Sequence, residues 1–236
     1  MRKFKTAFIL GAGLGTRLRP LTEHCPKPLL PLDGRPVITH AMDHLLQIGI
    51  ERFIVNTHHC PEIYRQKFPD NRWRGVPIIF RHEPVLLDTA GGLKNIEDLL
   101  GDEQTILCYN GDVIADFPLQ KLVQYHLQNS PEVTLVLRST GGPLNVIVDE
   151  GGRICDIRGK TQQKGAKACV FTGIYGLETD ILRHIEPGKP ETVINTFVQR
   201  IVEQPGSIMG IVIDEGNWDD IGSPESYRNL VGRRGG

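Results

Sequence analysis

The sequence predicts an α/β protein with a doubly wound, mostly parallel sheet and a small β-rich insertion in its second half. Over residues 6–137, short apolar runs typical of buried strands alternate with amphipathic stretches typical of helices. Such alternation indicates βαβ units, whose helices cover both faces of a Rossmann-like sheet. After about residue 140 the apolar runs shorten and Gly-rich turns separate them. No repeat or linker divides the 236 residues, so we expect a single domain, 1–236.

In the first half, about residues 1–140, apolar runs bounded by turn residues predict strands, and helical periodicity predicts the segments between them. A proline near the first turn supports the first helix, and Asp88 or Thr89 can cap the third. The expected strands are 6–10, 52–56, 77–80, 105–109 and 133–137, and the expected helices are 36–48, 62–68, 89–100 and 119–127.

The second half, about residues 141–236, begins with shorter strands. Asp149-Glu150-Gly151-Gly152 lies between two alternating runs and predicts a β-hairpin. A helix over 193–203 and a strand over 207–213 follow, and the end from Arg233 to Gly236 is expected to fray. The expected strands of the insertion are 144–148, 154–157 and 168–175.

Composition excludes several classes of protein. The net charge of −1, from 27 basic and 28 acidic residues, disfavours nucleic-acid binding through bulk charge. No apolar run is long enough to span a membrane, and the first one stops at Gly11, too early for a signal peptide. The five cysteines are widely spaced without a C-x-x-C pair, so we expect free thiols and a cytoplasmic protein.

A glycine loop, residues 11–17 (GAGLGTR), follows the first predicted strand. Its backbone N–H groups can approach an anion at the carboxyl end of a strand, where ligands of parallel sheets bind. Thr16 replaces the last glycine of the dinucleotide fingerprint, which argues against a nicotinamide-dependent oxidoreductase, and the G-K-[ST] of a Walker A loop is absent. Arg17, Arg19 and Lys27 lie on the proline-rich segment that continues the loop, an arrangement that suits a polyphosphate.

The segment 11–28 resembles the signature G-x-G-T-R-L-x-P-x-T-x-x-x-P-K-P of the sugar-1-phosphate nucleotidyltransferases, which have a GT-A-like fold. Further motifs recur in the family's order at 88–92 (DTAGG), 110–112 (NGD), 171–175 (FTGIY) and 218–222 (WDDIG), so the resemblance covers nearly the whole chain. Short members similar to this chain include N-acetylmuramate-1-phosphate uridylyltransferases and mannose-1-phosphate guanylyltransferases. The resemblance implies transfer of a nucleoside monophosphate from an NTP to a sugar 1-phosphate, with release of pyrophosphate.

The resemblance also implies roles for individual residues. Arg17 and Lys27 are the expected catalytic cations, and Asp112 and Asp220 are the expected ligands of Mg²⁺. The residues expected to bind the nucleotide are Leu10, Gly11, Ala12, Gly13, Gly15, Thr16, Glu83, Asp88, Thr89 and Ala90. Those expected to bind the sugar are Asn110, Asn145, Lys160, Gly173 and Glu178, with Arg158 as an alternative to Lys160.

The chemistry needs no general base, because a sugar 1-phosphate is largely dianionic at neutral pH. Glu83 taken alone favours guanine, since a carboxylate accepts from the adjacent N–H groups of that base, yet uridylyl transfer stays equally open. The alternative function is a non-catalytic nucleotide-sugar-binding regulator of the same fold. We expect no nucleic-acid or membrane partner, and a monomer or homodimer.

Overall fold

A ten-stranded sheet forms the centre of the computed structural model, which describes residues 3–234. Four strands at its middle are parallel, in the order β7 (Thr105–Asn110), β1 (Thr6–Leu10), β4 (Arg52–Thr57) and β6 (Val76–His82). The chain moves outward in one direction from β1 to β4 and β6, and β7 lies on the other side of β1. This change of direction creates a crevice at the carboxyl ends of β1 and β7 and confirms the predicted doubly wound fold.

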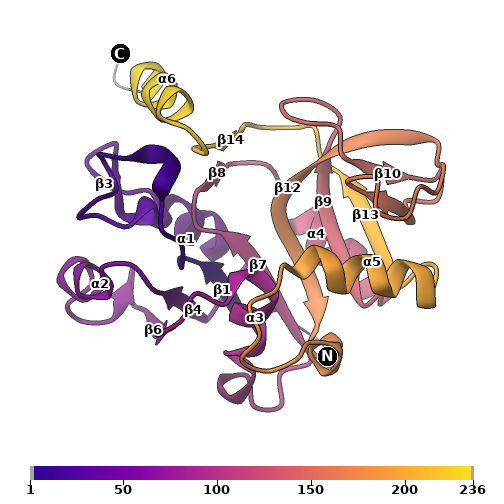
Figure 1. The fold of residues 1–236 in the computed structure, drawn as a ribbon, viewed down its shortest axis with the longest axis horizontal. Coiled ribbons are helices and arrows are strands. Elements are labelled where there is room, and N and C mark those ends of the chain that lie inside the picture. Colours follow the sequence, from indigo (N-terminus) through magenta and orange to yellow (C-terminus); the bar gives the residue numbers. More distant parts are fainter. Residues whose placement is uncertain (1–2, 235–236) are drawn as a thin grey trace.

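Beyond β7 the sheet becomes mixed. The long strand β12 (Lys167–Glu178) runs antiparallel to β7, to β9 (Val133–Arg138) and to β10 (Val146–Val148). The predicted hairpin joins β10 to β11 (Ile154–Ile157), and β13 (Ile208–Val212) runs parallel to β9. Figure 1 shows this β-rich part beside the parallel strands, so the predicted insertion extends one continuous sheet.

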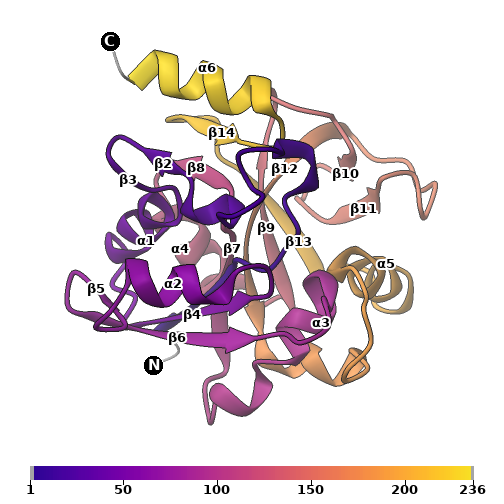
Figure 2. The same cartoon turned by 60° about the vertical axis from the view of Figure 1, so that its left-hand side comes forward.

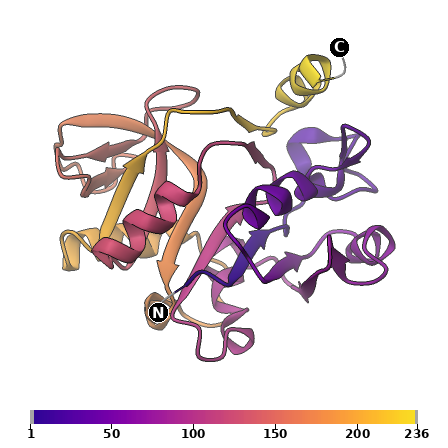
Figure 3. The ribbon, with the colours of Figure 1, turned by 180° about the vertical axis from the view of Figure 1, so that it is seen from behind.

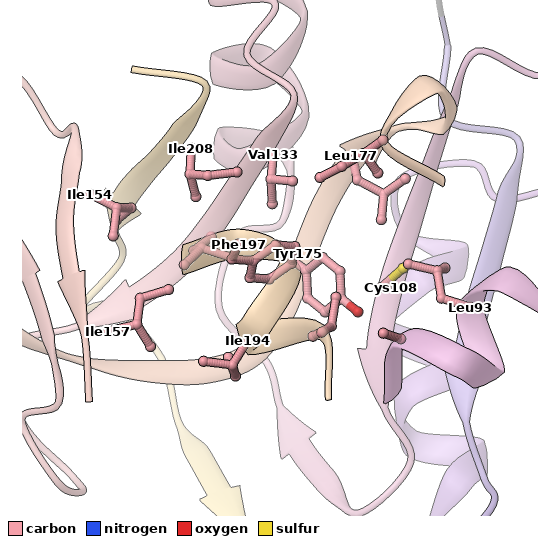
Figure 4. Packing of buried hydrophobic residues seen from close by; sticks show 14 of the residues in the cluster. Leu93, Cys108, Val133, Ile154, Ile157, Tyr175, Leu177, Ile194, Phe197 and Ile208 are labelled. Carbon is pink, nitrogen blue, oxygen red and sulfur yellow. The ribbon is translucent and has the colours of Figure 1, made fainter. Parts of the chain in front are cut away.

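Helices cover both faces of the sheet. On the face seen in Figure 1 lie α3 (Asp88–Lys94) and α5 (Val193–Glu203), and α1 (Ile38–Leu46) and α4 (Gln120–Asn129) lie on the face seen in Figure 3. The apolar side chains of α5 pack against the mixed part of the sheet (Figure 4). There the rings of Phe197 and Tyr175 meet edge to face, with their centroids 5.5 Å apart. Such aromatic pairs add to the stabilisation from apolar burial.

Two predicted helices are shorter than expected. The first begins at Ile38, because Arg35–Pro36 forms strand β3 with β2 (Pro31–Leu32). The third ends at Lys94 and continues as a separate 3₁₀ turn, η3 (Glu97–Leu99), since Gly91 and Gly92 weaken its helical propensity. Helix α2 (Pro61–Lys67) and the remaining strands lie within a few residues of their predicted positions.

The sequence did not predict helix α6 (Pro224–Arg234), because few of its residues are apolar and only Tyr227 and Leu230 are buried. The predicted frayed end is wrong for Arg233 and Arg234, which belong to α6, and its last two residues lie outside the described range. Figure 2 shows α6 above the β2–β3 hairpin. The remaining short elements are β5 (Arg72–Trp73), β8 (Val113–Ala115), β14 (Trp218–Asp220), η1 (Thr16–Leu18), η2 (Lys27–Leu29) and η4 (Thr179–His184).

Two further findings concern the cysteines and the apolar content of the helices. All five cysteines are unpaired thiols. None of the helices within residues 3–234 combines the length and the apolar content that crossing a membrane requires.

Candidate active site

A cavity of 430 Å³ opens at the carboxyl ends of β1 and β7, in the crevice where the strand order changes direction. The glycine loop, Lys27, Leu86, Thr89 and Asn110 all contribute to its lining. Several residues expected to bind a nucleotide therefore lie together in the structure. They are Leu10, Gly11, Ala12, Gly13, Gly15, Thr16 and Thr89.

The glycine loop is fixed at its start and open in its middle. The N–H groups of Gly11 and Ala12 donate to Asn56 Oδ1 at 2.8 and 3.2 Å, and the Tyr64 hydroxyl donates to Gly11 O at 3.0 Å. Among the described residues, the N–H groups of Gly13 and Gly15, and of Leu14 between them, have no hydrogen-bond acceptor. Of the backbone N–H groups expected to bind an anion, these three are the ones that remain available.

Two cations flank the loop. Arg17, on η1, is exposed at the cavity mouth, whereas the side chain of Lys27, on η2, is only 11% exposed. Pro26 and Pro28 fix the backbone on either side of Lys27, and its Nζ forms an ion pair with Asp112. This arrangement holds a positive charge at the inner end of the cavity.

Two carboxylates distant in the sequence meet at the same place. Asp112 lies in the turn between β7 and β8, and Asp220 ends β14, which pairs with β8. The N–H of Ile221 donates to Asp112 O at 3.1 Å and holds the two segments together. Partial desolvation and the nearby Asp112 charge raise the pKa of Asp220, although Lys27 and Arg17 oppose that shift. A divalent cation would relieve this like-charge repulsion.

The donor set suits Mg²⁺. Within residues 3–234 no three or more His, Cys, Asp or Glu side chains gather into a metal cluster, so two carboxylates are what this chain offers. Magnesium usually takes one or two carboxylates and completes its shell with phosphate oxygens and water. Asp112 and Asp220 therefore fit a metal that arrives with a phosphorylated substrate.

A second cavity, of 240 Å³, adjoins the first. Thr89 and Asn110 line both cavities, Asp112 lines the first and Asp220 lines the second. The carboxylate pair therefore lies at the boundary between the two spaces. Any ligands in the two cavities would meet beside it.

The second cavity contains several residues that the sequence motifs singled out. Asn145, Gly173 and Arg158 line it, and the N–H of Arg158 donates to Asn145 O at 2.7 Å. Gly173 has a φ of 79°, and a Cβ there would lie 2.5 Å from Asn110 Nδ2, so only glycine lets Asn110 lie across the boundary. The sequence assigned no role to the other lining side chains, which include Pro143, Phe171, Thr172, Thr192, Ile194 and Trp218.

The structure corrects the expected nucleotide contact of Glu83. Its side chain is fully buried, and its carboxylate oxygens accept from Asn56 Nδ2 at 2.7 Å and from Leu87 N at 3.1 Å. Glu83 is absent from the cavity lining, so the expectation of a direct nucleotide contact is wrong for this arrangement. Its position one residue beyond a strand did not distinguish a ligand-binding carboxylate from a buried one.

Two neighbours of Thr89 also lie away from the cavity. Ala90 is buried in the core and its N–H donates to Glu191 O at 2.8 Å, whereas Asp88 is exposed and accepts from Thr89 N at 2.6 Å. The expected helix cap is wrong as well. Thr89 Oγ1 accepts from Val193 N at 2.7 Å and so caps α5 instead of α3.

Two of the residues expected to bind the sugar lie outside the second cavity. Glu178 pairs in register with Thr105, at the opposite end of β7 from Asn110, so the length of β7 separates it from both cavities. Lys160 is outside the cavity lining, and its Nζ donates to Asn195 Oδ1 at 3.0 Å on α5. Of the two alternatives that the sequence left open, Arg158 is the one that lines the second cavity.

Comparison with known proteins gives a family match over almost the whole chain. The model of the family described as nucleotidyl transferase matches residues 6–232. A mannose-1-phosphate guanylyltransferase of Mycobacterium tuberculosis is 33% identical over 225 residues, covering 94% of this chain and 62% of its own length. A UTP–glucose-1-phosphate uridylyltransferase of Synechocystis is 28% identical, covering 95% and 62%. The chain thus spans about three fifths of these curated relatives.

Solved structures share the fold. HddC from Yersinia pseudotuberculosis superposes with a TM-score of 0.79 at 19% identity, over 98% of this chain and 99% of its own. A putative glucose-1-phosphate thymidylyltransferase from Bacillus anthracis, in complex with a sucrose, gives a TM-score of 0.82 at 21% identity, over 97% and 94%. Their arrangement of strands and helices is therefore that of this chain.

Proposed function

The chain belongs to the nucleotidyl transferase family, and from this premise we propose that it transfers a nucleoside monophosphate from an NTP to a sugar 1-phosphate. One observation carries the proposal. Two cavities share a wall, and Lys27, Asp112 and Asp220 lie at or beside it. A site for joining two phosphorylated substrates needs such an arrangement, because the reacting phosphates must meet where negative charge can be neutralised.

In the proposed reaction the NTP occupies the first cavity. The N–H groups of Gly13, Leu14 and Gly15 bind the β- and γ-phosphates together with Arg17. A phosphate oxygen of the sugar 1-phosphate attacks the α-phosphorus, and the bond from that phosphorus to the β-phosphate bridging oxygen breaks. Pyrophosphate leaves on the side of the glycine loop, where its charge is already matched.

Lys27 is the cation nearest the proposed reaction centre. Its ion pair with Asp112 holds the ammonium at the boundary of the cavities before substrate arrives. Placed there, Lys27 neutralises charge on the α-phosphate and on the incoming sugar phosphate. The attacking oxygen carries no proton at neutral pH, so no side chain has to act as a base.

We propose Mg²⁺ as the cofactor, held by Asp112 and Asp220. When bound, the ion supplies further charge neutralisation at the phosphates. Burial and, after it, the charge of nearby Asp112 raise the pKa of Asp220, and a bound cation would offset both effects, which supports this assignment.

The two halves of the chain contribute to different cavities. Residues 10–112 supply the whole lining of the first cavity, and most of the second is lined by residues 143–220. We therefore propose a nucleotide-binding half, about 1–140, and a sugar-binding and metal-completing half, about 141–236. A cytoplasmic location, supported by the five unpaired thiols, and a monomer or homodimer stay predictions.

Pyrophosphate release, measured across four NTPs and a set of sugar 1-phosphates with Mg²⁺, tests the proposal. We expect turnover with GTP or UTP, because one relative is named a guanylyltransferase and another a UTP–glucose-1-phosphate uridylyltransferase. Lys27→Ala and Asp112→Ala should abolish release and leave the melting temperature near the wild-type value. Lys121→Ala is the matched control, because it also removes a lysine from an ion pair, with Glu215, outside both cavities.

A regulator that binds without catalysis would behave differently. It would be stabilised by an NTP or a nucleotide sugar but would release no pyrophosphate with any substrate pair. That result would favour the alternative function over catalysis.

A further inference from the structure

A chain of buried hydrogen bonds joins two segments that line the first cavity, the glycine loop and the segment carrying Leu86. It starts at the glycine loop, where Asn56 Oδ1 accepts from Gly11 N and Ala12 N. Asn56 Nδ2 donates to Glu83 Oε1 at 2.7 Å, and Glu83 Oε2 accepts from Leu87 N at 3.1 Å. Leu87 directly follows Leu86, which lines the same cavity as the glycine loop. We call Asn56 and Glu83 the buried pair.

The buried pair is enclosed and has one favourable orientation. Asn56 is 2% exposed and Glu83 is 0% exposed. Both oxygens of Glu83 accept, so the amide group of Asn56 must face it, and the Asn56 oxygen must face the glycine loop. A flipped Asn56 would place its NH₂ against the Gly11 and Ala12 N–H groups, and buried donors without acceptors are costly.

Helix α3 closes over the pair without leaving space. A Cβ on Gly92 would lie 2.7 Å from Asn56 Nδ2 and 2.8 Å from Glu83 Oε1. Glycine at this position therefore lets the helix backbone pack directly against the polar groups. The pair thus connects the ends of β1, β4 and β6 to the helix that carries Thr89.

We propose that Asn56 and Glu83 are positioning residues that set the glycine loop relative to the Leu86 segment of the nucleotide cavity. Asn56 occupies the first two N–H groups of the loop, which leaves those of Gly13, Leu14 and Gly15 for the phosphates. Glu83 fixes the orientation of Asn56 and, through Leu87, the segment carrying Leu86. This inference rests on the proposed function only in that the first cavity takes an NTP.

The hydrogen-bond polarity of the pair gives a specific test. In Glu83→Gln, the side chain cannot accept from both Asn56 and Leu87, so one buried donor loses its acceptor. In Asn56→Asp, two carboxylates face each other across 2.7 Å. The double variant N56D/E83Q reverses the donor and the acceptor. The amide at position 83 then donates to the carboxylate at position 56, and both backbone contacts are kept.

The experiment measures binding of Mg-GTP and Mg-UTP by calorimetry and, where turnover occurs, KM for each substrate. Each single variant should weaken NTP binding about tenfold, because the glycine loop and the Leu86 segment are no longer held in their binding arrangement. The double variant should return to within about threefold of wild type, because every hydrogen bond is again formed. KM for the sugar 1-phosphate should change less than about twofold in all three variants, since the second cavity does not contact the pair.

Glu103→Gln is the matched control. Glu103 is a carboxylate at the other end of the same strands, bonded to Thr6 and Arg52. Its substitution should lower the melting temperature without changing NTP affinity. A purely structural role for the buried pair would give the same result in Glu83→Gln.

Several outcomes would overturn the proposal. They are single variants with wild-type NTP affinity, a double variant that binds no better than the weaker single one, and a double variant that does not fold. Should both single variants unfold, recovery of folding and NTP binding in the double variant supports the pair. If NTP binding follows the predicted pattern but no pyrophosphate is released, the result contradicts the proposed function and supports the positioning role.

Discussion

The two edges of the parallel strands carry polar side chains that are used in opposite ways. At the amino edge, Thr6, Arg52 and Glu103 bond to one another. Thr6 Oγ1 donates to Glu103 at 2.7 Å, Arg52 Nη2 donates to Glu103 at 2.5 Å, and Arg52 Nε donates to Thr6 at 3.0 Å. At the carboxyl edge, Asn56 accepts a hydrogen bond from the backbone of the glycine loop, and Lys27 and Asp112 line the first cavity.

The difference follows from chain direction. Parallel strands bring all their carboxyl ends to one edge, where the loops that follow them converge and leave backbone donors without partners. At the amino edge, Thr6, Arg52 and Glu103 instead satisfy one another in a local network. We therefore expect substitutions at the amino edge to change stability and those at the carboxyl edge to change ligand binding and turnover.

The largest expected effect is that of Lys27→Ala. Removal of the Lys27 ammonium leaves the charge that develops at the α-phosphate without its nearest cation, so kcat should fall about 10³-fold. The free energy of unfolding should change little, because the lost ion pair is partly exposed. Steady-state pyrophosphate release and urea unfolding measure the two quantities. A large loss of stability with normal turnover would break the comparison between the edges.

Asp220→Asn should give the next effect. Loss of one carboxylate should raise the Mg²⁺ concentration for half-maximal activity about 10- to 100-fold. Removing the repulsion with Asp112 should at the same time leave the metal-free protein at least as stable as wild type. A Mg²⁺ titration of activity and a thermal melt in the presence of EDTA test both parts. An unchanged Mg²⁺ requirement would contradict the assignment of Asp220 as a ligand.

Much of the fold could be predicted because its signals are local. Buried strands such as β1 and β7 are short apolar runs next to glycine or asparagine, and the alternation with helices gives their parallel order. Helix α6 gave no such signal. It buries only Tyr227 and Leu230, against segments near residue 31, and such long-range packing leaves no periodic pattern in the sequence.

The candidate site shows the same limit. Lys27 could be singled out because it lies in the long motif at 11–28, and Asp112 and Asp220 because the short motifs around them recur in the family's order. The roles expected for Glu83 and Glu178 do not fit the structure, since the residue type does not reveal which way a strand end faces. Glu83 turns inward to Asn56, and Glu178 lies at the far end of the sheet. Only the pairing of the strands decides these positions.

At the amino edge, Glu103→Gln sharpens the comparison. Hydrogen bonds from Thr6 and Arg52 to a neutral amide oxygen are weaker than those to a carboxylate, so stability should fall by about 1 kcal/mol. KM and kcat should stay at wild-type values, because the network lies at the opposite ends of the strands from both cavities. Urea unfolding gives the first quantity and the pyrophosphate assay gives the second. A change in KM for the NTP would show that the edges are coupled.

The smallest expected effect is a pH dependence of the free energy of unfolding, which comes from a buried histidine. His44 is 2% exposed on α1, and its ring nitrogens contact Tyr109 Oη at 3.1 Å and Phe117 O at 2.6 Å, next to the turn that carries Asp112. Burial lowers the pKa of His44, although the Phe117 carbonyl and Asp116 oppose the shift.

Below the pKa of about 6.5 of the unfolded state, the unfolded chain binds a proton that folded His44 does not, so stability falls as the pH decreases toward the lower folded pKa. Burial also lowers the pKa of His40, which contributes to the same slope. His44→Gln should therefore reduce, and not abolish, the loss of stability between about pH 7.5 and 5.5, since the amide cannot take up the proton. Urea unfolding at several pH values measures the slope. Equal slopes in the variant and the wild type would mean that His44 is protonated in the folded protein as readily as in the unfolded chain.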